Sequence, residues 1–149
     1  MAAPSAQLHG IEYPGAQPFS TRWPDLGCTN LWGLSRAEVG RIGEDIAVAR
    51  LQARHWRLLA RNLRVGRDEL DALFTQGSRL NVVEVKTRRG SGFGWGRDAL
   101  SATKIHHLRR ATSRWLSQQS QGFSEVSFYC AEVSIVAART VHFELVEVA

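Results

Sequence analysis

The residues best suited to chemistry lie in one short segment, residues 80–87, where an apolar strand pattern is interrupted by Glu84 and Lys86. Side chains at positions i and i+2 lie on one face of a strand, so this carboxylate and this ammonium point the same way. Of the nineteen basic residues only two are lysines, Lys86 and Lys104. A position that stays lysine under such a bias indicates a need for a compact charge that can lose its proton. Because a charged pair on a hydrophobic strand costs free energy, we expect Glu84 and Lys86 to belong to a functional site.

A second carboxylate, Asp71, is expected opposite Glu84 on the preceding strand. The segment Gln76–Arg79 contains Gly-Ser, which is a hairpin turn signal, and pairing its first residue with its last fixes the register. This register also places Glu69 opposite Lys86, with facing Cβ atoms about 5 Å apart. Two carboxylates this close either share a proton or hold a cation between them. Mg²⁺ is a suitable cation, since it binds one or two carboxylates together with substrate phosphate.

A plain structural explanation of these charges is a cross-strand ion pair between Glu69 and Lys86, with the two acids at a wet edge of the sheet. That arrangement predicts a strand with one polar face. Instead, apolar residues occupy both faces, with Val83 and Val85 on one and Leu80 and Val82 on the other. We therefore favour a metal site that holds Mg²⁺ or Mn²⁺.

Two more charged residues are expected to point toward the sheet from helices. Glu44 lies on the apolar stripe of its helix, where it is either a metal ligand or an acid that the helix dipole favours. Gly40 and Gly43 would let this helix approach the sheet closely, which favours the ligand. Lys104 lies on the apolar line of a later helix, where it either meets a phosphate or lays its stem over the core.

Positive charge is concentrated next to these acids. The net charge of the chain is +5, and residues 86–114 carry eight basic residues against one acid. Such a block beside a carboxylate site predicts a polyanionic partner, most simply nucleic acid, with DNA preferred to RNA. The alternative is a solvated arginine face. The residues expected to contact the phosphate backbone are Arg88, Arg89, Arg97 and Lys104.

The elements that must position these residues follow from periodicity and turn signals. They are a helix at 35–54, strands at 56–65, 69–75 and 80–87, a helix at 101–118, and strands at 126–136 and 141–148. Ser35 and Glu38 form a capping box at the start of the first helix. The order αβββαββ predicts an α/β fold, in which a mixed sheet is flanked by helices.

Length and composition predict one domain at 36–149, preceded by an extension at 1–35. The extension is rich in Pro, Gly, Ser and Thr, and we interpret it as a mobile tail or as sequence upstream of the true start codon. No apolar run approaches a membrane span, and no secretory signal is recognisable. Two distant cysteines fit a reducing cytoplasm.

These motifs resemble the YraN family of bacterial proteins. The resemblance rests on Gly-Glu in the first helix, the Glu-x-Asp strand, Val-Glu-Val-Lys-Thr-Arg, and a helix with an early lysine. The family is similar to the Holliday-junction resolvases of the PD-(D/E)xK nuclease superfamily, which implies a restriction-endonuclease-like αβββαβ core. By position, the catalytic residues implied are Asp71, Glu84 and Lys86, and Glu44 matches the helix acid of resolvase-like members. Glu69 and Lys104 match family positions of less certain role.

The activity expected from residues and resemblance together is metal-dependent endonuclease cleavage of DNA, with branched or structured DNA as one candidate substrate. In this scheme Asp71, Glu84 and Glu44 hold the metal, and Lys86 orients water or stabilises charge on the phosphate. A non-catalytic nucleic-acid-binding module with the same fold is the main alternative, and a structural protein that binds an acidic partner is the third. A homodimer would suit a two-stranded substrate.

Overall fold

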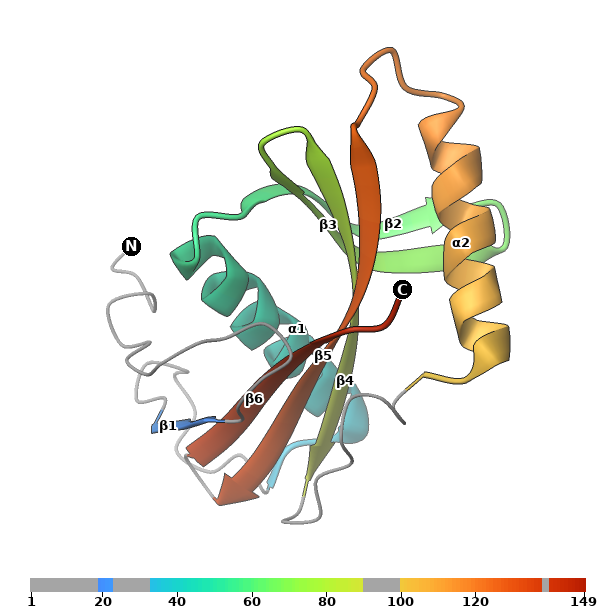
Figure 1. Ribbon diagram of the computed structural model, residues 1–149. Coiled ribbons are helices and arrows are strands. Elements are labelled where there is room, and N and C mark those ends of the chain that lie inside the picture. Colours follow the sequence, from blue (N-terminus) through green and yellow to red (C-terminus); the bar gives the residue numbers. More distant parts are fainter. Residues whose placement is uncertain (1–18, 23–32, 90–99, 138–139) are drawn as a thin grey trace.

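A computed structural model describes residues 19–22, 33–89, 100–137 and 140–149 of the chain (Figure 1). Its elements are β1 (Phe19–Arg22), α1 (Arg36–Ala53), β2 (Arg57–Val65), β3 (Asp68–Gln76), β4 (Arg79–Arg89), α2 (Ala102–Leu116), β5 (Glu125–Ala137) and β6 (Thr140–Glu147). The predicted order αβββαββ is confirmed, with element ends within about two residues of those expected. Within the expected N-terminal extension, β1 is an additional strand, while residues 1–18 and 23–32 lie outside the described residues.

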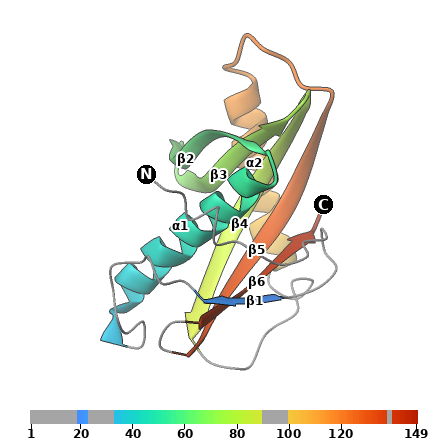
Figure 2. The same cartoon turned by 90° about the vertical axis from the view of Figure 1, so that its left-hand side faces the viewer.

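The strands form one mixed sheet in the order β1-β6-β5-β4-β3-β2. All neighbours are antiparallel except β4 and β5, which are parallel because the chain crosses over through α2 between them. Figures 1 and 2 show α1 and α2 on opposite faces of this sheet. The protein therefore has the α/β fold that the sequence predicts. No helix in the described ranges is long and apolar enough to cross a membrane.

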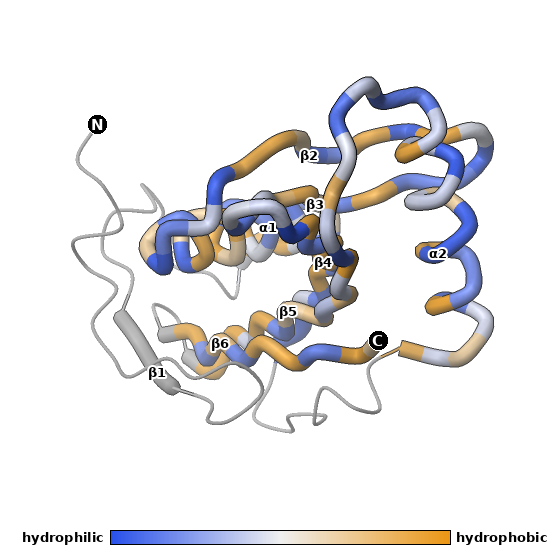
Figure 3. Tube along the Cα trace, turned by 45° about the horizontal axis from the view of Figure 1, so that its top comes forward, coloured by the Kyte–Doolittle hydropathy of each residue, from blue (hydrophilic) through white to orange (hydrophobic). Residues whose placement is uncertain are grey.

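Each helix covers its own hydrophobic cluster. The cluster under α1 includes Ile46, Leu51 and Trp56, and the rings of Phe74 and Tyr129 pack edge-on against Trp56 at centroid distances of 5.8 and 5.1 Å. The cluster under α2 is built around the buried residues Leu73, Leu80, Val82, Leu108 and Phe128. Hydrophobic and hydrophilic residues alternate along β6, as Figure 3 shows, so successive side chains face opposite sides of the sheet.

Both helices begin at serine caps. The Ser35 hydroxyl accepts a hydrogen bond from the Glu38 amide at 3.2 Å, and the Ser35 amide donates to the Glu38 carboxylate at 2.8 Å, so the predicted capping box is confirmed. The Ser101 hydroxyl accepts from the backbone amide of Lys104 at 3.1 Å. This cap fixes Lys104 in the first turn of α2.

The β3–β4 hairpin has the predicted register, because Gln76 pairs with Arg79 and Gly77 adopts a φ of +60° in the turn. The ladder between these strands ends at Ala72 and Val83. Beyond that point β3 pairs with β2 as far as the turn at Gly66, whereas β4 pairs with β5. The sheet thus forks where β3 and β4 separate, and Asp71 and Glu84 are the next residues on the two branches.

Candidate active site at a fork in the sheet

The fork brings the carboxyl groups of Asp71 and Glu84 within hydrogen-bonding reach of each other. Asp71 is held by the Val85 amide, which donates to its Oδ2 at 2.9 Å. Glu84 is 8% exposed, and its buried Oε1 receives no hydrogen bond from a donor in the described residues. The two acids thus lie together as the sequence predicts, although the β3–β4 ladder ends one residue pair before them. A buried carboxylate oxygen without a donor requires a proton or a cation for its charge.

Burial raises the pKa of Glu84 to about 7, and the neighbouring Asp71 carboxylate raises it as well. Burial also raises the pKa of Asp71, although the hydrogen bond from Val85 and the charge of Lys104 oppose this effect. Two interacting carboxyls of this kind titrate as a pair. Near neutral pH, the ion-free pair tends to keep one proton, which a divalent cation would displace.

A cation is already built into the site. Lys104 reaches from the first turn of α2, and its Nζ lies 3.2 Å from Oε2 of Glu84. Its charge lowers the pKa of both Glu84 and Asp71. The sequence predicts that Lys104 meets a phosphate or covers the apolar core, so its ion pair with Glu84 was not predicted. The rarity of lysine in this chain is the one signal that pointed to a role for Lys104 in the site.

Lys86 lies two residues beyond Glu84 and its side chain is exposed. Its strand partner on β5 is Glu132. Burial raises the pKa of this acid, and the charges of Arg88 and Lys86 oppose that effect. The expected pairing of Lys86 with Glu69 is wrong, because the β3–β4 ladder ends before it. Glu69 is exposed, and its charge raises the pKa of Asp71.

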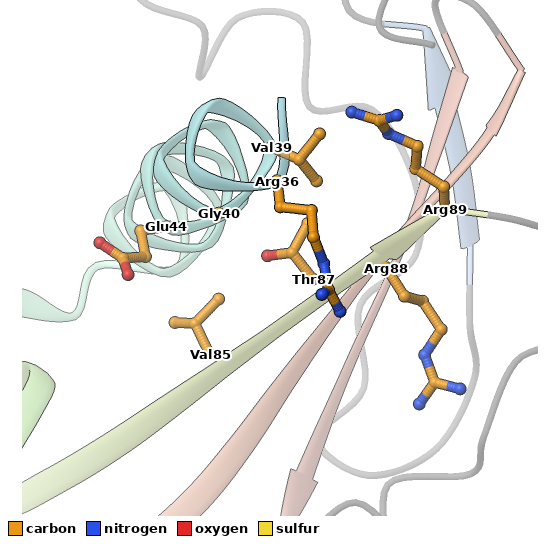
Figure 4. A pocket seen from close by; sticks show the side chains of 8 residues that line it. All are labelled: Arg36, Val39, Gly40, Glu44, Val85, Thr87, Arg88 and Arg89. Atoms are coloured by element: carbon orange, nitrogen blue, oxygen red, sulfur yellow. The ribbon is translucent and has the colours of Figure 1, made fainter. Parts of the chain in front are cut away.

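Glu44 lies on α1 at one end of a pocket of about 420 Å³ between that helix and β4 (Figure 4). Burial raises its pKa, the charge of Asp71 raises it further, and a hydrogen bond with Asn62 lowers it. The fold thus places Glu44 near enough to the fork for the charge of Asp71 to act on it. However, no three acidic, histidine or cysteine side chains in the described part of the chain are close enough together to hold a metal ion. Glu44 therefore does not form a three-ligand metal site with Asp71 and Glu84 in this structure.

Gly43 permits the close approach of α1 to the sheet. A Cβ atom at this position would lie 1.8 Å from Oγ1 of Thr87 on β4, which is far inside van der Waals contact. The prediction that Gly40 also allows this close approach is wrong, because a Cβ atom at Gly40 would meet open space.

The described members of the predicted phosphate-binding set differ in their contacts. The Nη2 of Arg88 forms an ion pair with Oε2 of the buried Glu132 at 3.2 Å, so this arginine neutralises a core acid. Figure 4 shows the Arg88 and Arg89 side chains pointing in different directions from β4. Arg88 and Arg89 both line the α1 pocket, together with Arg36. Arg97 lies outside the described residues.

The sequence of residues 43–148 matches the family described as Uncharacterised protein family UPF0102. The chain belongs to this family. A UPF0102 protein of Mycolicibacterium vanbaalenii is 41% identical over 101 residues, which cover 68% of this chain and 84% of the relative. A relative from Mycolicibacterium smegmatis is 42% identical over 88 residues, covering 58% and 71%, and one from a Parafrankia species is 41% identical over 80 residues, covering 54% and 68%.

The acids of this UPF0102 site suit a hard divalent cation. Asp71 and Glu84 offer oxygen ligands, which Mg²⁺ and Mn²⁺ prefer, and the buried Oε1 of Glu84 accepts no hydrogen bond from the part of the chain that the structure describes. Two carboxylates are enough for Mg²⁺ when phosphate and water complete the coordination. The residues present thus fit the ion with two protein ligands, and the expected third, Glu44, would act through water.

Proposed function

We propose that this UPF0102 protein is a metal-dependent endonuclease that hydrolyses phosphodiester bonds in DNA. The observation that carries the proposal is the pair of Asp71 and Glu84 at the fork, where a buried Glu84 oxygen has no donor among the described residues. The αβββαβ order of the core supports it, because the restriction-endonuclease-like fold has this order. Mg²⁺ or Mn²⁺, when bound, polarises a phosphoryl oxygen and lowers the pKa of bound water.

The protein's own residues would divide the remaining work. Asp71 and Glu84 hold the ion, and the Val85 amide fixes the orientation of Asp71. Lys86 is exposed beside the pair, where its ammonium can contact the scissile phosphate and stabilise the charge that develops on it. Lys104 stabilises the ionised form of Glu84, the form that binds a cation.

A second candidate function is a nucleic-acid-binding module without catalysis. One observation favours it: Asp71 already takes part in the hydrogen bonding of the fold through Val85, so these acids have a structural use. This alternative predicts DNA binding that is indifferent to divalent metal.

The deciding experiment is calorimetric titration of Mg²⁺ and Mn²⁺ into the wild type and Glu84→Ala, with a branched-DNA cleavage assay alongside. The matched control is Glu125→Ala, because Glu125 is an exposed acid at the start of β5 that pairs with Arg79 at the hairpin end of β4. We expect Glu84→Ala to lose metal binding and cleavage while it keeps or gains DNA affinity, and Glu125→Ala to behave as wild type.

Two outcomes would reject the endonuclease. Metal binding retained in Glu84→Ala would show that the ion is held elsewhere. A wild type that binds no metal, but whose DNA affinity falls steeply with salt, would indicate the binding module.

A further inference from the structure

A basic pocket lies beside the candidate active site, at the turn between β2 and β3. This turn pocket has a volume of about 400 Å³ and is lined by Arg67, Asp68, Arg110, Ala111 and Arg114. Three guanidinium groups face one carboxylate, so the lining carries an excess of positive charge. Such a concave, basic surface concentrates anions.

Asp68, the acid in the lining of the turn pocket, holds Arg110 in place. Nε and Nη2 of Arg110 donate to the two carboxylate oxygens of Asp68 at 3.0 and 2.9 Å. This bidentate ion pair lowers the pKa of Asp68 and joins α2 to β3. The acid is therefore already used within the fold, and its charge is balanced by Arg110.

The other two arginines, Arg67 and Arg114, form no ion pair with a carboxylate in the described ranges. Arg114 lies against the turn, because a Cβ atom on Gly66 would be 2.6 Å from its Nη1. The glycine, with a φ of +61°, thus gives the turn its shape and leaves room for a guanidinium beside it. Two unpaired, exposed guanidinium groups at one pocket match the planar, bidentate geometry that binds phosphate.

The turn pocket is connected to the carboxylate pair by two elements. Along β3, Asp68 and Asp71 are three residues apart, or about 10 Å. Along α2, Lys104 and Arg114 are ten residues apart, or about 15 Å. Both β3 and α2 therefore lead from the site to the pocket.

We infer that the turn pocket binds a backbone phosphate of the DNA strand about three to four nucleotides from the scissile phosphate. Each nucleotide advances a strand of duplex DNA by about 3.4 Å, so three to four of them span the distance of about 10–15 Å. The inference rests on the proposed function, and it specifies a substrate whose strand continues past the cleaved bond toward the β2–β3 turn.

The test compares wild type with the double variant Arg67→Ala, Arg114→Ala. The control is Arg57→Ala, which removes an exposed arginine at the opposite end of β2. Binding of a labelled duplex of about 30 base pairs is measured by fluorescence anisotropy in EDTA over a salt series, so cleavage does not interfere. We expect the double variant to lose affinity at least tenfold at low salt and its log–log salt slope to fall by about two, with the control close to wild type. Circular dichroism establishes that all three proteins are folded.

If the affinity and the salt slope of the double variant equal those of Arg57→Ala, the turn pocket does not bind a DNA phosphate. In a second measurement, cleavage is followed on duplexes that are shortened step by step on either side of the bond. Wild type should lose activity once fewer than about four nucleotides remain on one side, and the double variant should be indifferent to that length. If wild type binds through the pocket but never cleaves, the endonuclease proposal fails while the pocket stands.

Discussion

Glu84→Gln should stabilise the fold at alkaline pH, although it removes a charged residue from an ion pair. In the folded wild type the pKa of Glu84 is raised from its ordinary 4.5 to about 7, chiefly by burial. At 1.36 kcal/mol for each pH unit, ionising this carboxyl costs the fold about 3 kcal/mol. Glutamine has nearly the same shape and no charge, so it avoids that cost. The attraction of Lys104 is already included in that raised pKa, so losing this ion pair adds no second cost. The gain expected at pH 8 is therefore about 3 kcal/mol.

The sign depends on pH. Below about pH 4.5, Glu84 is protonated in both the folded and unfolded wild type, and the variant has no advantage. As the pH rises from about 4.5 to about 7, the unfolded chain releases its proton before the folded chain does, so the wild type loses stability relative to Glu84→Gln. Above about pH 7 the full difference is present and remains constant.

The assay is thermal unfolding of both proteins between pH 4 and pH 8, with Glu147→Gln as the control for an exposed carboxyl on β6. A gain of about 3 kcal/mol corresponds to a rise of about 6–12 °C in Tm at pH 8 for a chain of this size. Mg²⁺ should then raise the Tm of wild type but not of Glu84→Gln, by about 2.7 kcal/mol of stability at a hundredfold excess over Kd. A Tm difference that does not change with pH, or a variant less stable than wild type at pH 8, would refute the reasoning.

Two further predictions concern packing. Gly43→Ala should destabilise the fold by about 1–3 kcal/mol, since its Cβ collides with Thr87, whereas Gly40→Ala should be neutral or stabilising by up to about 1 kcal/mol; chemical denaturation of both variants checks this pair. The thiol of Cys130 is fully buried and its pKa is raised to about 12, so it should resist alkylation by iodoacetamide at pH 8 until the protein unfolds, as mass spectrometry can show. Rapid labelling of the native thiol would contradict this burial.

Features fixed by neighbouring residues could be predicted from the sequence. The capping box at Ser35 and Glu38 and the hairpin turn at Gly77 depend on a few adjacent residues, so the start of α1 and the β3–β4 register follow directly. The opposition of Asp71 and Glu84 follows from that register. These local determinants explain why the predicted fold class is correct and why the two acids lie close together.

Features that depend on packing between distant segments could not be predicted from the sequence. A register taken from a turn assumes a straight ladder, whereas β3 leaves β4 after Ala72 and stays paired with β2, so Glu69 never reaches Lys86. The contact of Lys104 with Glu84 requires the position of α2 across the sheet, which no local pattern gives. β1 is short and pairs with β6 more than a hundred positions away, so its segment shows no strand pattern of its own.

The hydrogen bond from Val85 to Asp71 makes one backbone amide a reporter of the site. Because β3 has already left β4 at this level, the Val85 amide donates to a side chain rather than to a neighbouring strand. The rate at which the Val85 amide hydrogen exchanges with solvent deuterium therefore depends on whether Asp71 keeps this hydrogen bond. A proton or an ion that draws Oδ2 away should speed exchange at this amide while the rest of β4 stays protected. Occupancy of the acids could thus be followed residue by residue, without knowledge of the substrate.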